Sequence, residues 1–253
     1  MAKYIVTDTS LSSIADAIRN KGNTVASLAF PSGFVSAIND ISAGGGDSKE
    51  DEIIARTISR SYINNTILKI GIYAFASCIN LTTVSFPEVT TIGSYAFTYC
   101  TSLTTVSFPK ATTIGASAFQ SCINLTTVSF PKVTTIGSSA FGHCGSLTTV
   151  SFPEVTTIGA SAFANCGSLT TVSFPKVTTI SNYAFSSCTN LTTVSFPKAT
   201  NIGNYAFGSC YKLISLYLLN NSIVSLTGSK VFNSSPIGGY SASAGRFGSV
   251  FVP

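Results

Sequence analysis

One sequence motif recurs through this chain at a fixed spacing of 22 residues. The stretch LTTVSFPEVTTIGSYAFTYC at 81–100 returns as LTTVSFPKATTIGASAFQSC at 103–122 and as LTTVSFPKVTTIGSSAFGHC at 125–144. Seven copies follow one another without insertion or deletion, each with an isoleucine at the same place: Ile70, Ile92, Ile114, Ile136, Ile158, Ile180 and Ile202. Such a repeat is typical of supersecondary units that bury their apolar faces only by stacking. The period therefore predicts a solenoid over residues 70–212.

The pattern within one copy predicts the elements of each coil. The segment LTTVSF alternates apolar and polar residues, is rich in β-branched types and ends at Pro87, so it predicts a short strand. The segment VTTI predicts a second extended piece, and the spacing of Ala96, Phe97 and Cys100 predicts one helical turn. The expected inward set is Leu81, Val84, Phe86, Val89, Ile92, Ala96, Phe97 and Cys100. We expect an α/β solenoid with one short parallel strand and one helical turn per coil.

Each copy also ends in a cysteine at the same position: Cys78, Cys100, Cys122, Cys144, Cys166, Cys188 and Cys210. Stacked coils would place these residues in a column about 4.8 Å apart, the spacing of paired strands. That spacing exceeds the ~3.5 to 4.5 Å between Cβ atoms that a disulfide needs, and equal steps of 22 residues do not give the short ligand spacing of a zinc site. We expect a structural ladder of buried, reduced thiols and no metal.

The composition argues against several classes of function. The chain is 45% hydrophobic and only 9% charged, and its 14 basic residues are scattered, so the net charge of +5 does not predict nucleic-acid binding. The seven copies contain only two acidic residues, Glu88 and Glu154, and the residue next to His143 is Cys144, one of the cysteines expected to be buried. We therefore expect no enzyme activity and no cofactor.

Targeting signals are missing from the first residues. The start MAKYIVTDTS has an apolar run far shorter than the roughly 7 to 15 residues of a secretory signal, and no stretch reaches the ~18 apolar residues of a membrane span. We expect synthesis in the bacterial cytoplasm, no encoded route through the general secretory pathway and no membrane insertion.

The repeat resembles the BspA-like (Treponema pallidum type) leucine-rich repeat. The residues that carry the resemblance are Leu81, Val84, Phe86, Pro87, Val89, Ile92, Gly93, Ala96, Phe97 and Cys100. The resemblance implies a right-handed coil with the strand on the concave side, and it implies binding or adhesion without catalysis. It places an N-terminal cap at 53–69 and a C-terminal cap at 213–253.

The N-terminal region has a different pattern. Residues 7–41 are similar to a segment found in tail and baseplate-associated proteins of phages and prophages of Gram-positive gut bacteria. Periodicity predicts two short helices in 1–43, whose apolar stripes would serve attachment or oligomerisation, although a helical pair docked on the first coil stays an alternative. The stripe residues are Leu11, Ile14, Ile18, Phe34, Ile38 and Ile41. Residues 44–52, rich in glycine, serine and charge, predict a flexible linker.

Exposed positions of the coils are the candidate binding residues. The strand would carry two hydroxyl columns, headed by Thr83 and Ser85, and beside them a row of mixed charges that begins at Glu88; for both, solvation is the simpler interpretation. Tyrosines offer rigid contact area, so we expect ligand contact at positions on the predicted helical side, against the alternative of lateral packing. These positions are Tyr73, Tyr95, Tyr99, His143, Tyr183, Tyr205 and Tyr211.

Two functions fit these features. The first is a phage or prophage tail-associated protein located in the virion, bound to tail proteins or to itself through residues 1–43, whose solenoid recognises a host cell-surface protein or glycan. The alternative is a bacterial cell-surface adhesin or host-interaction protein.

Overall fold

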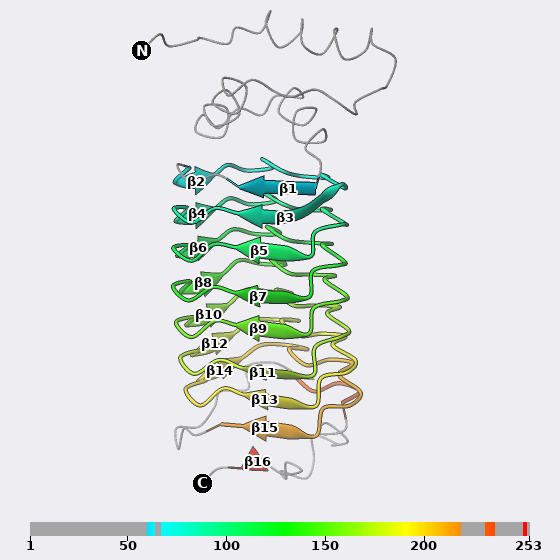
Figure 1. Cartoon of the computed structure of the whole chain (residues 1–253). Helices are drawn as coiled ribbons and strands as arrows, with labels where there is room; N and C mark the ends of the chain where they lie inside the picture. The colour runs from blue at the N-terminus through cyan, green and yellow to red at the C-terminus, as the bar shows by residue number, and fades with distance from the viewer. Residues whose placement is uncertain (1–59, 64–66, 219–230, 236–249, 252–253) are drawn as a thin grey trace, which may run out of the picture.

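The protein forms a parallel β-solenoid in which every coil lies in register with the next. The structure is a computed structural model, and it describes residues 60–63, 67–218, 231–235 and 250–251. Two columns of strands run along the solenoid (Figure 1). The first column consists of β1 (Arg60–Ile63), β3 (Leu81–Ser85), β5 (Thr105–Ser107), β7 (Thr127–Ser129), β9 (Thr149–Ser151), β11 (Thr171–Ser173), β13 (Thr193–Ser195), β15 (Ser215–Tyr217) and β16 (Val250–Phe251). The second consists of β2 (Lys69–Ile70), β4 (Thr91–Ile92), β6 (Thr113–Ile114), β8 (Thr135–Ile136), β10 (Thr157–Ile158), β12 (Thr179–Ile180) and β14 (Asn201–Ile202).

All strand pairing is parallel, and its register follows the repeat. Ile158 pairs with Ile136 on one side and with Ile180 on the other, one repeat away in each direction. The second column forms one unbroken sheet from β2 to β14, whereas the first divides into β1-β3-β5, β7-β9 and β11-β13-β15-β16. The predicted solenoid and both extended segments of the coil are confirmed.

The predicted helical turn is wrong, because the described part of the chain contains no helix. Between Gly93 and Cys100 the backbone forms successive tight turns. The N–H groups of alternate residues donate to carbonyls three residues earlier, at 3.4, 3.2 and 3.2 Å for Ala96, Thr98 and Cys100. The N–H groups between them donate to the next coil, at 2.8, 2.7 and 2.8 Å for Tyr95, Phe97 and Tyr99. A helix would keep these bonds within one segment, but here half of them join coils.

Left-handed backbone at two positions per coil also excludes a helix. The first position is held by Tyr73, Tyr95, Ser117, Ser139, Ser161, Tyr183 and Tyr205, and the second by Ser77, Tyr99, Ser121, His143, Asn165, Ser187 and Ser209. Their φ angles lie between 52° and 61°. Each is the third residue of a tight turn, where a type II turn requires positive φ. These turns therefore place ordinary side chains in a conformation that glycine adopts more easily.

Replacing one of these residues with glycine is expected to stabilise the protein. At Ser139, with φ of 55°, the relief of ~1 to 2 kcal/mol of left-handed strain exceeds the ~0.5 to 1 kcal/mol entropic cost of glycine, which leaves a gain of about 0.5 to 1 kcal/mol. Chemical denaturation of Ser139→Gly against the parent measures it. The matched control is Ser138→Gly, next to it and without positive φ, which we expect to lose stability. Equal losses of stability in both variants would contradict the prediction that Ser139 carries backbone strain.

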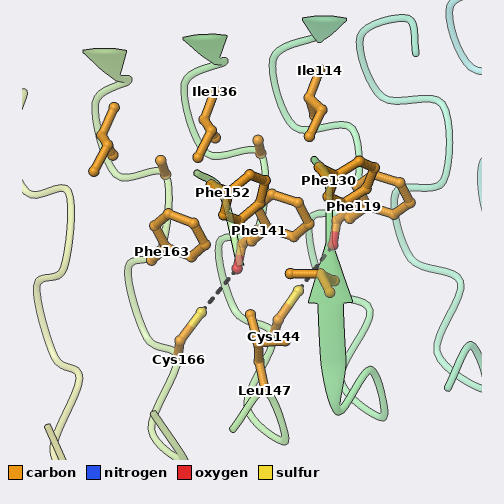
Figure 2. Packing of buried hydrophobic residues seen from close by; sticks show 14 of the residues in the cluster. Ile114, Phe119, Phe130, Ile136, Phe141, Cys144, Leu147, Phe152, Phe163 and Cys166 are labelled. Carbon is orange, nitrogen blue, oxygen red and sulfur yellow. Dashed lines mark hydrogen bonds between the residues drawn. The ribbon is translucent and has the colours of Figure 1, made fainter. Parts of the chain in front are cut away.

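The core is built from two columns of stacked phenylalanine rings. One column comes from the turns and includes Phe119, Phe141 and Phe163, whose consecutive ring centroids lie 5.3 Å apart with near-parallel planes (Figure 2). The other follows the first strand column and includes Phe130 and Phe152, 5.5 Å apart. Rings of different columns meet at tilted angles, such as 59° between Phe141 and Phe152. Parallel-displaced and tilted arrangements are the ones that aromatic rings prefer. All eight residues of the predicted inward set are buried; among their equivalents in other coils, Val106 and Val150 are only partly buried.

A glycine before the turns lets adjacent coils approach closely. A Cβ atom at Gly137 would lie 2.5 Å from the carbonyl carbon of Gly115, closer than real contacts allow. One coil has Ser181 at this position. The recurrence of glycine after the isoleucine therefore has a packing cause.

Residues 231–235, within the segment expected to form the C-terminal cap, stack on the last coil as a further turn. Phe232 stacks on Phe207 at 5.5 Å, and the Phe207 N–H donates to the Val231 carbonyl at 2.9 Å. Strand β16 then pairs with β15. Ser235 holds the place of the cysteine, and its buried hydroxyl has no hydrogen-bond partner within the described part of the chain. The helices predicted in 1–43 with their six stripe residues, the linker 44–52 and most of the N-terminal cap lie outside the described residues.

Candidate binding surface

The cysteine ladder is a feature of the core. All seven cysteines are buried and free, as predicted. Each thiol from Cys100 onward also donates to the carbonyl of a phenylalanine in the preceding coil, for example Cys144 Sγ to Phe119 O at 3.1 Å and Cys166 Sγ to Phe141 O at 3.1 Å (Figure 2). Sequence spacing gave no sign of these bonds. The ladder therefore ties neighbouring coils together.

Burial makes these thiols hard to ionise. It raises the pKa of Cys144 to about 12 and that of Cys210 to about 12. Burial also raises the pKa of Cys122 well above its usual value, with a further rise from the neighbouring Cys144 and Cys100. Because the thiolate is the reactive form, this ladder is not suited to nucleophilic or metal chemistry.

The strand face carries the two predicted hydroxyl columns. In β7 and β9 the side chains of Thr127, Ser129, Thr149 and Ser151 are exposed. They have no hydrogen-bond partner among the residues that the structure describes. Other threonines are engaged: the hydroxyl of Thr148 donates to a carbonyl of the preceding coil at 3.1 Å. This part of the coil thus carries both hydroxyls that bond to the preceding coil and hydroxyls that are exposed to solvent.

The row of mixed charges forms ion pairs along the solenoid axis. Lys110 Nζ lies 2.7 Å from Glu88 Oε2, and Lys176 Nζ lies 2.6 Å from Glu154 Oε2. All four side chains are partly exposed, and such pairs contribute at most about 1 kcal/mol each. The row therefore supplies solubility more than stability.

The third face, which we call the turn surface, has no charged side chain. It comprises residues 71–77 and the equivalent seven residues of each later coil, which include no Asp, Glu, Lys or Arg. Four of the predicted contact residues share its first left-handed column: Tyr73, Tyr95, Tyr183 and Tyr205. The structure brings them together in two pairs and leaves Ser117, Ser139 and Ser161 between the pairs. We call these three serines the serine interval.

The rings within each pair stack. Tyr73 and Tyr95 have ring centroids 4.8 Å apart and planes within 11°, and Tyr183 and Tyr205 have centroids 5.2 Å apart and planes within 3°. Tyr95 and Tyr183, which border the serine interval, remain 36% and 45% exposed. The sequence pattern indicated their exposure but not this stacking, which follows from the coil register.

The other predicted contact residues lie outside the first left-handed column. Tyr99 and His143 occupy the second left-handed column and are exposed, two coils apart. Tyr211 is exposed but follows Cys210, outside the turn surface. The seven predicted residues therefore do not form one cluster.

Two other kinds of feature are absent from the described residues. Nowhere in 60–63, 67–218, 231–235 or 250–251 do three or more His, Cys, Asp or Glu side chains group in a way that could hold a metal ion. The same residues include no helix with the length and apolar character needed to cross a membrane.

Comparison with sequence families gives one match. The BspA type leucine rich repeat region matches residues 55–166 and 134–238. No curated protein matches the chain.

Solved structures of similar fold come from several bacteria. A leucine rich repeat protein of Treponema pallidum is 31% identical, with 61% of this chain and 78% of that protein covered and a TM-score of 0.56. A leucine-rich repeat protein of Bacteroides ovatus is 24% identical, with 65% and 58% covered and a TM-score of 0.48. A leucine rich cell surface protein of Faecalibacterium prausnitzii is 22% identical, with 64% and 60% covered and a TM-score of 0.44. This chain thus spans less than two thirds of the last two proteins.

Proposed function

The chain belongs to the BspA-type leucine-rich repeat family, and from this we propose that it is a non-enzymatic binding protein whose turn surface recognises a ligand at a cell surface. Members of this repeat family are typically binding proteins. We further propose a location at the bacterial cell surface. This is the adhesin or host-interaction function that the sequence left as its alternative.

The proposal rests on the positions at which the sequences of the coils differ. Buried positions are nearly the same in every coil, because stacking demands it. On the turn surface, in contrast, equivalent positions hold tyrosine, serine, asparagine or histidine. Four tyrosines there are at least 36% exposed: Tyr73, Tyr95, Tyr99 and Tyr183. Exposed tyrosines give rigid, amphipathic contact area at low entropic cost.

Cell binding tests the proposal directly. The full chain, labelled with a fluorophore, is incubated with bacterial cells and with epithelial cells, and binding is measured by flow cytometry. Changing Tyr73, Tyr95, Tyr183 and Tyr205 to serine, which the fold already accepts in that column, is expected to lower binding at least ~10-fold, as for loss of interface anchors. The matched control changes Thr127 and Thr149 to alanine on the strand face and should leave binding intact. Loss of binding in the control alone would overturn the choice of surface.

A second candidate function rests on the N-terminal resemblance alone. Residues 7–41 resemble phage tail-associated proteins, and a virion protein would use this region for attachment or self-association. The family match begins at residue 55 and gives this candidate no support. The mass of the chain in solution separates the two: a defined oligomer that is lost on deletion of residues 1–45 favours virion assembly, and a monomer unaffected by the deletion favours the binding protein.

A further inference from the structure

Each tyrosine pair presents to the serine interval a ring face that no other described aromatic ring covers. Tyr95 stacks on Tyr73 in the preceding coil, so its second face is directed to the following coil, where Ser117 stands. Tyr183 stacks on Tyr205 in the following coil, so its second face is directed back to Ser161. Neither Tyr95 nor Tyr183 has another ring contact among the described residues. The two faces therefore look toward each other along the solenoid.

The geometry of the repeat sets the distance between them. Four coil steps separate Tyr95 from Tyr183, which is about 19 Å at a strand spacing of ~4.8 Å. Between them the second and third positions of the turn surface in each coil hold only small side chains: Ala116, Ser117, Ser138, Ser139, Ala160 and Ser161. A ligand can therefore lie along the interval and meet an aromatic ring at each end.

The chemistry of the interval favours a neutral ligand rich in hydroxyl groups. The turn surface has no charged side chain, so a charged ligand would lose water without gaining a counter-charge. Ser117 is buried, at 7% exposure, but the partly exposed hydroxyls of Ser139 and Ser161 can both donate and accept hydrogen bonds. His143 and Asn165 stand exposed in the adjacent column. The electron-rich ring faces of tyrosine attract the weakly positive C–H groups of a sugar ring.

We infer that the serine interval, bordered by Tyr95 and Tyr183, binds a neutral oligosaccharide whose terminal sugar rings stack on the two tyrosines. This inference rests on the proposed function and names the class of its ligand. A proline-rich peptide would also stack on aromatic rings, but such peptides use apolar pockets, and the interval has no side chain larger than serine to line one.

Titration with neutral oligosaccharides tests the inference. The chain has no tryptophan, so its intrinsic fluorescence comes from its ten tyrosines, which include Tyr95 and Tyr183. The probes are linear oligomers of glucose, mannose and N-acetylglucosamine, about four to eight units long. Their binding is measured by tyrosine fluorescence and by calorimetry. We expect at least one oligomer to bind, and Tyr95→Ser or Tyr183→Ser to weaken its binding about 10-fold or more, since one face is lost.

Two further variants distinguish a spanning ligand from two separate sites. Ser139→Tyr places a ring in the middle of the interval and is expected to abolish binding of the longer oligomer. Tyr211→Ser, outside the turn surface, is the matched control and should leave it unchanged. Equal weakening by Tyr211→Ser, binding of a proline-rich peptide in place of sugar, or no binding by any oligomer would overturn the inference.

The outcome is distinguishable from that of the cell-binding experiment. If cells still bind through the tyrosines while no oligosaccharide does, the ligand class is wrong and the proposed function stands. If the tyrosine variants leave cell binding intact, the proposed function itself fails.

Discussion

Raising the pH from 8 to 11 is expected to unfold this solenoid steeply. Burial in the folded protein raises the pKa of five thiols well above about 8.5, the ordinary value for cysteine. These residues are Cys122, Cys144, Cys166, Cys188 and Cys210. Above that pH the unfolded chain loses the thiol protons while the folded chain keeps them, so the folded state binds more protons and its stability falls as pH rises.

The size of the effect follows from the number of thiols. Each thiol costs ~1.4 kcal/mol per pH unit between about 8.5 and its folded pKa, which is about 12 for Cys144. Five such thiols give about 7 kcal/mol per unit, comparable with the ~5 to 15 kcal/mol total stability of an ordinary domain. Below pH 8 the thiols are protonated in both states and contribute no slope.

Urea denaturation at pH 8, 9 and 10, followed by circular dichroism, measures this slope. Lysine and tyrosine also titrate near pH 10, so a cysteine variant is the decisive control. Cys144→Ala is expected to be less stable than the parent at pH 8 but to lose less stability per pH unit. A slope unchanged by the substitution would show that other groups cause the alkaline unfolding.

Phe141→Ala is expected to lower the free energy of unfolding by about 3 to 5 kcal/mol, the usual cost of deleting a buried ring. Phe141 stacks on Phe119 and Phe163 at 5.3 Å each and meets Phe130 and Phe152 at a tilt. Its loss leaves a cavity shared by three coils. Since each coil contacts only its neighbours, the array should also separate into two units that unfold at different denaturant concentrations.

Phe232→Ala provides the matched comparison for this prediction. Phe232 is the last ring of the same column among the described residues, and within them it stacks on one ring only, Phe207. Its removal should cost clearly less and should leave a single transition. A loss at Phe232 equal to that at Phe141 would mean that the column does not act through contacts between successive coils.

The sequence predicted the features that side-chain spacing controls. The period gave the number of coils, alternation gave both strand segments, and the fixed positions of Phe97 and Cys100 placed them in a buried stack. Each follows from one requirement: apolar side chains one repeat apart must lie over one another. Within a strict repeat, that requirement is sufficient.

Features that depend on the backbone could not be obtained this way. The spacing of Ala96, Phe97 and Cys100 fits one helical turn and also fits successive tight turns, and only the hydrogen bonds to the next coil distinguish them. The positive φ of Tyr95 had no signal, because glycine does not mark the position. The stacking of Tyr95 on Tyr73 required knowledge of which turn residues share a column.

The unbroken register of the solenoid has a consequence for how this protein can vary between strains. Recombination between nearly identical copies of the repeat would insert or remove whole coils, and every junction formed would match those already present. A gene with one copy more or fewer between the codons of Tyr95 and Tyr183 would encode a protein that still folds, with the tyrosines moved apart or together by ~4.8 Å. If the proposed oligosaccharide spans the two tyrosines, each added or removed coil would change the length of ligand that fits by ~4.8 Å while the core residues stay the same.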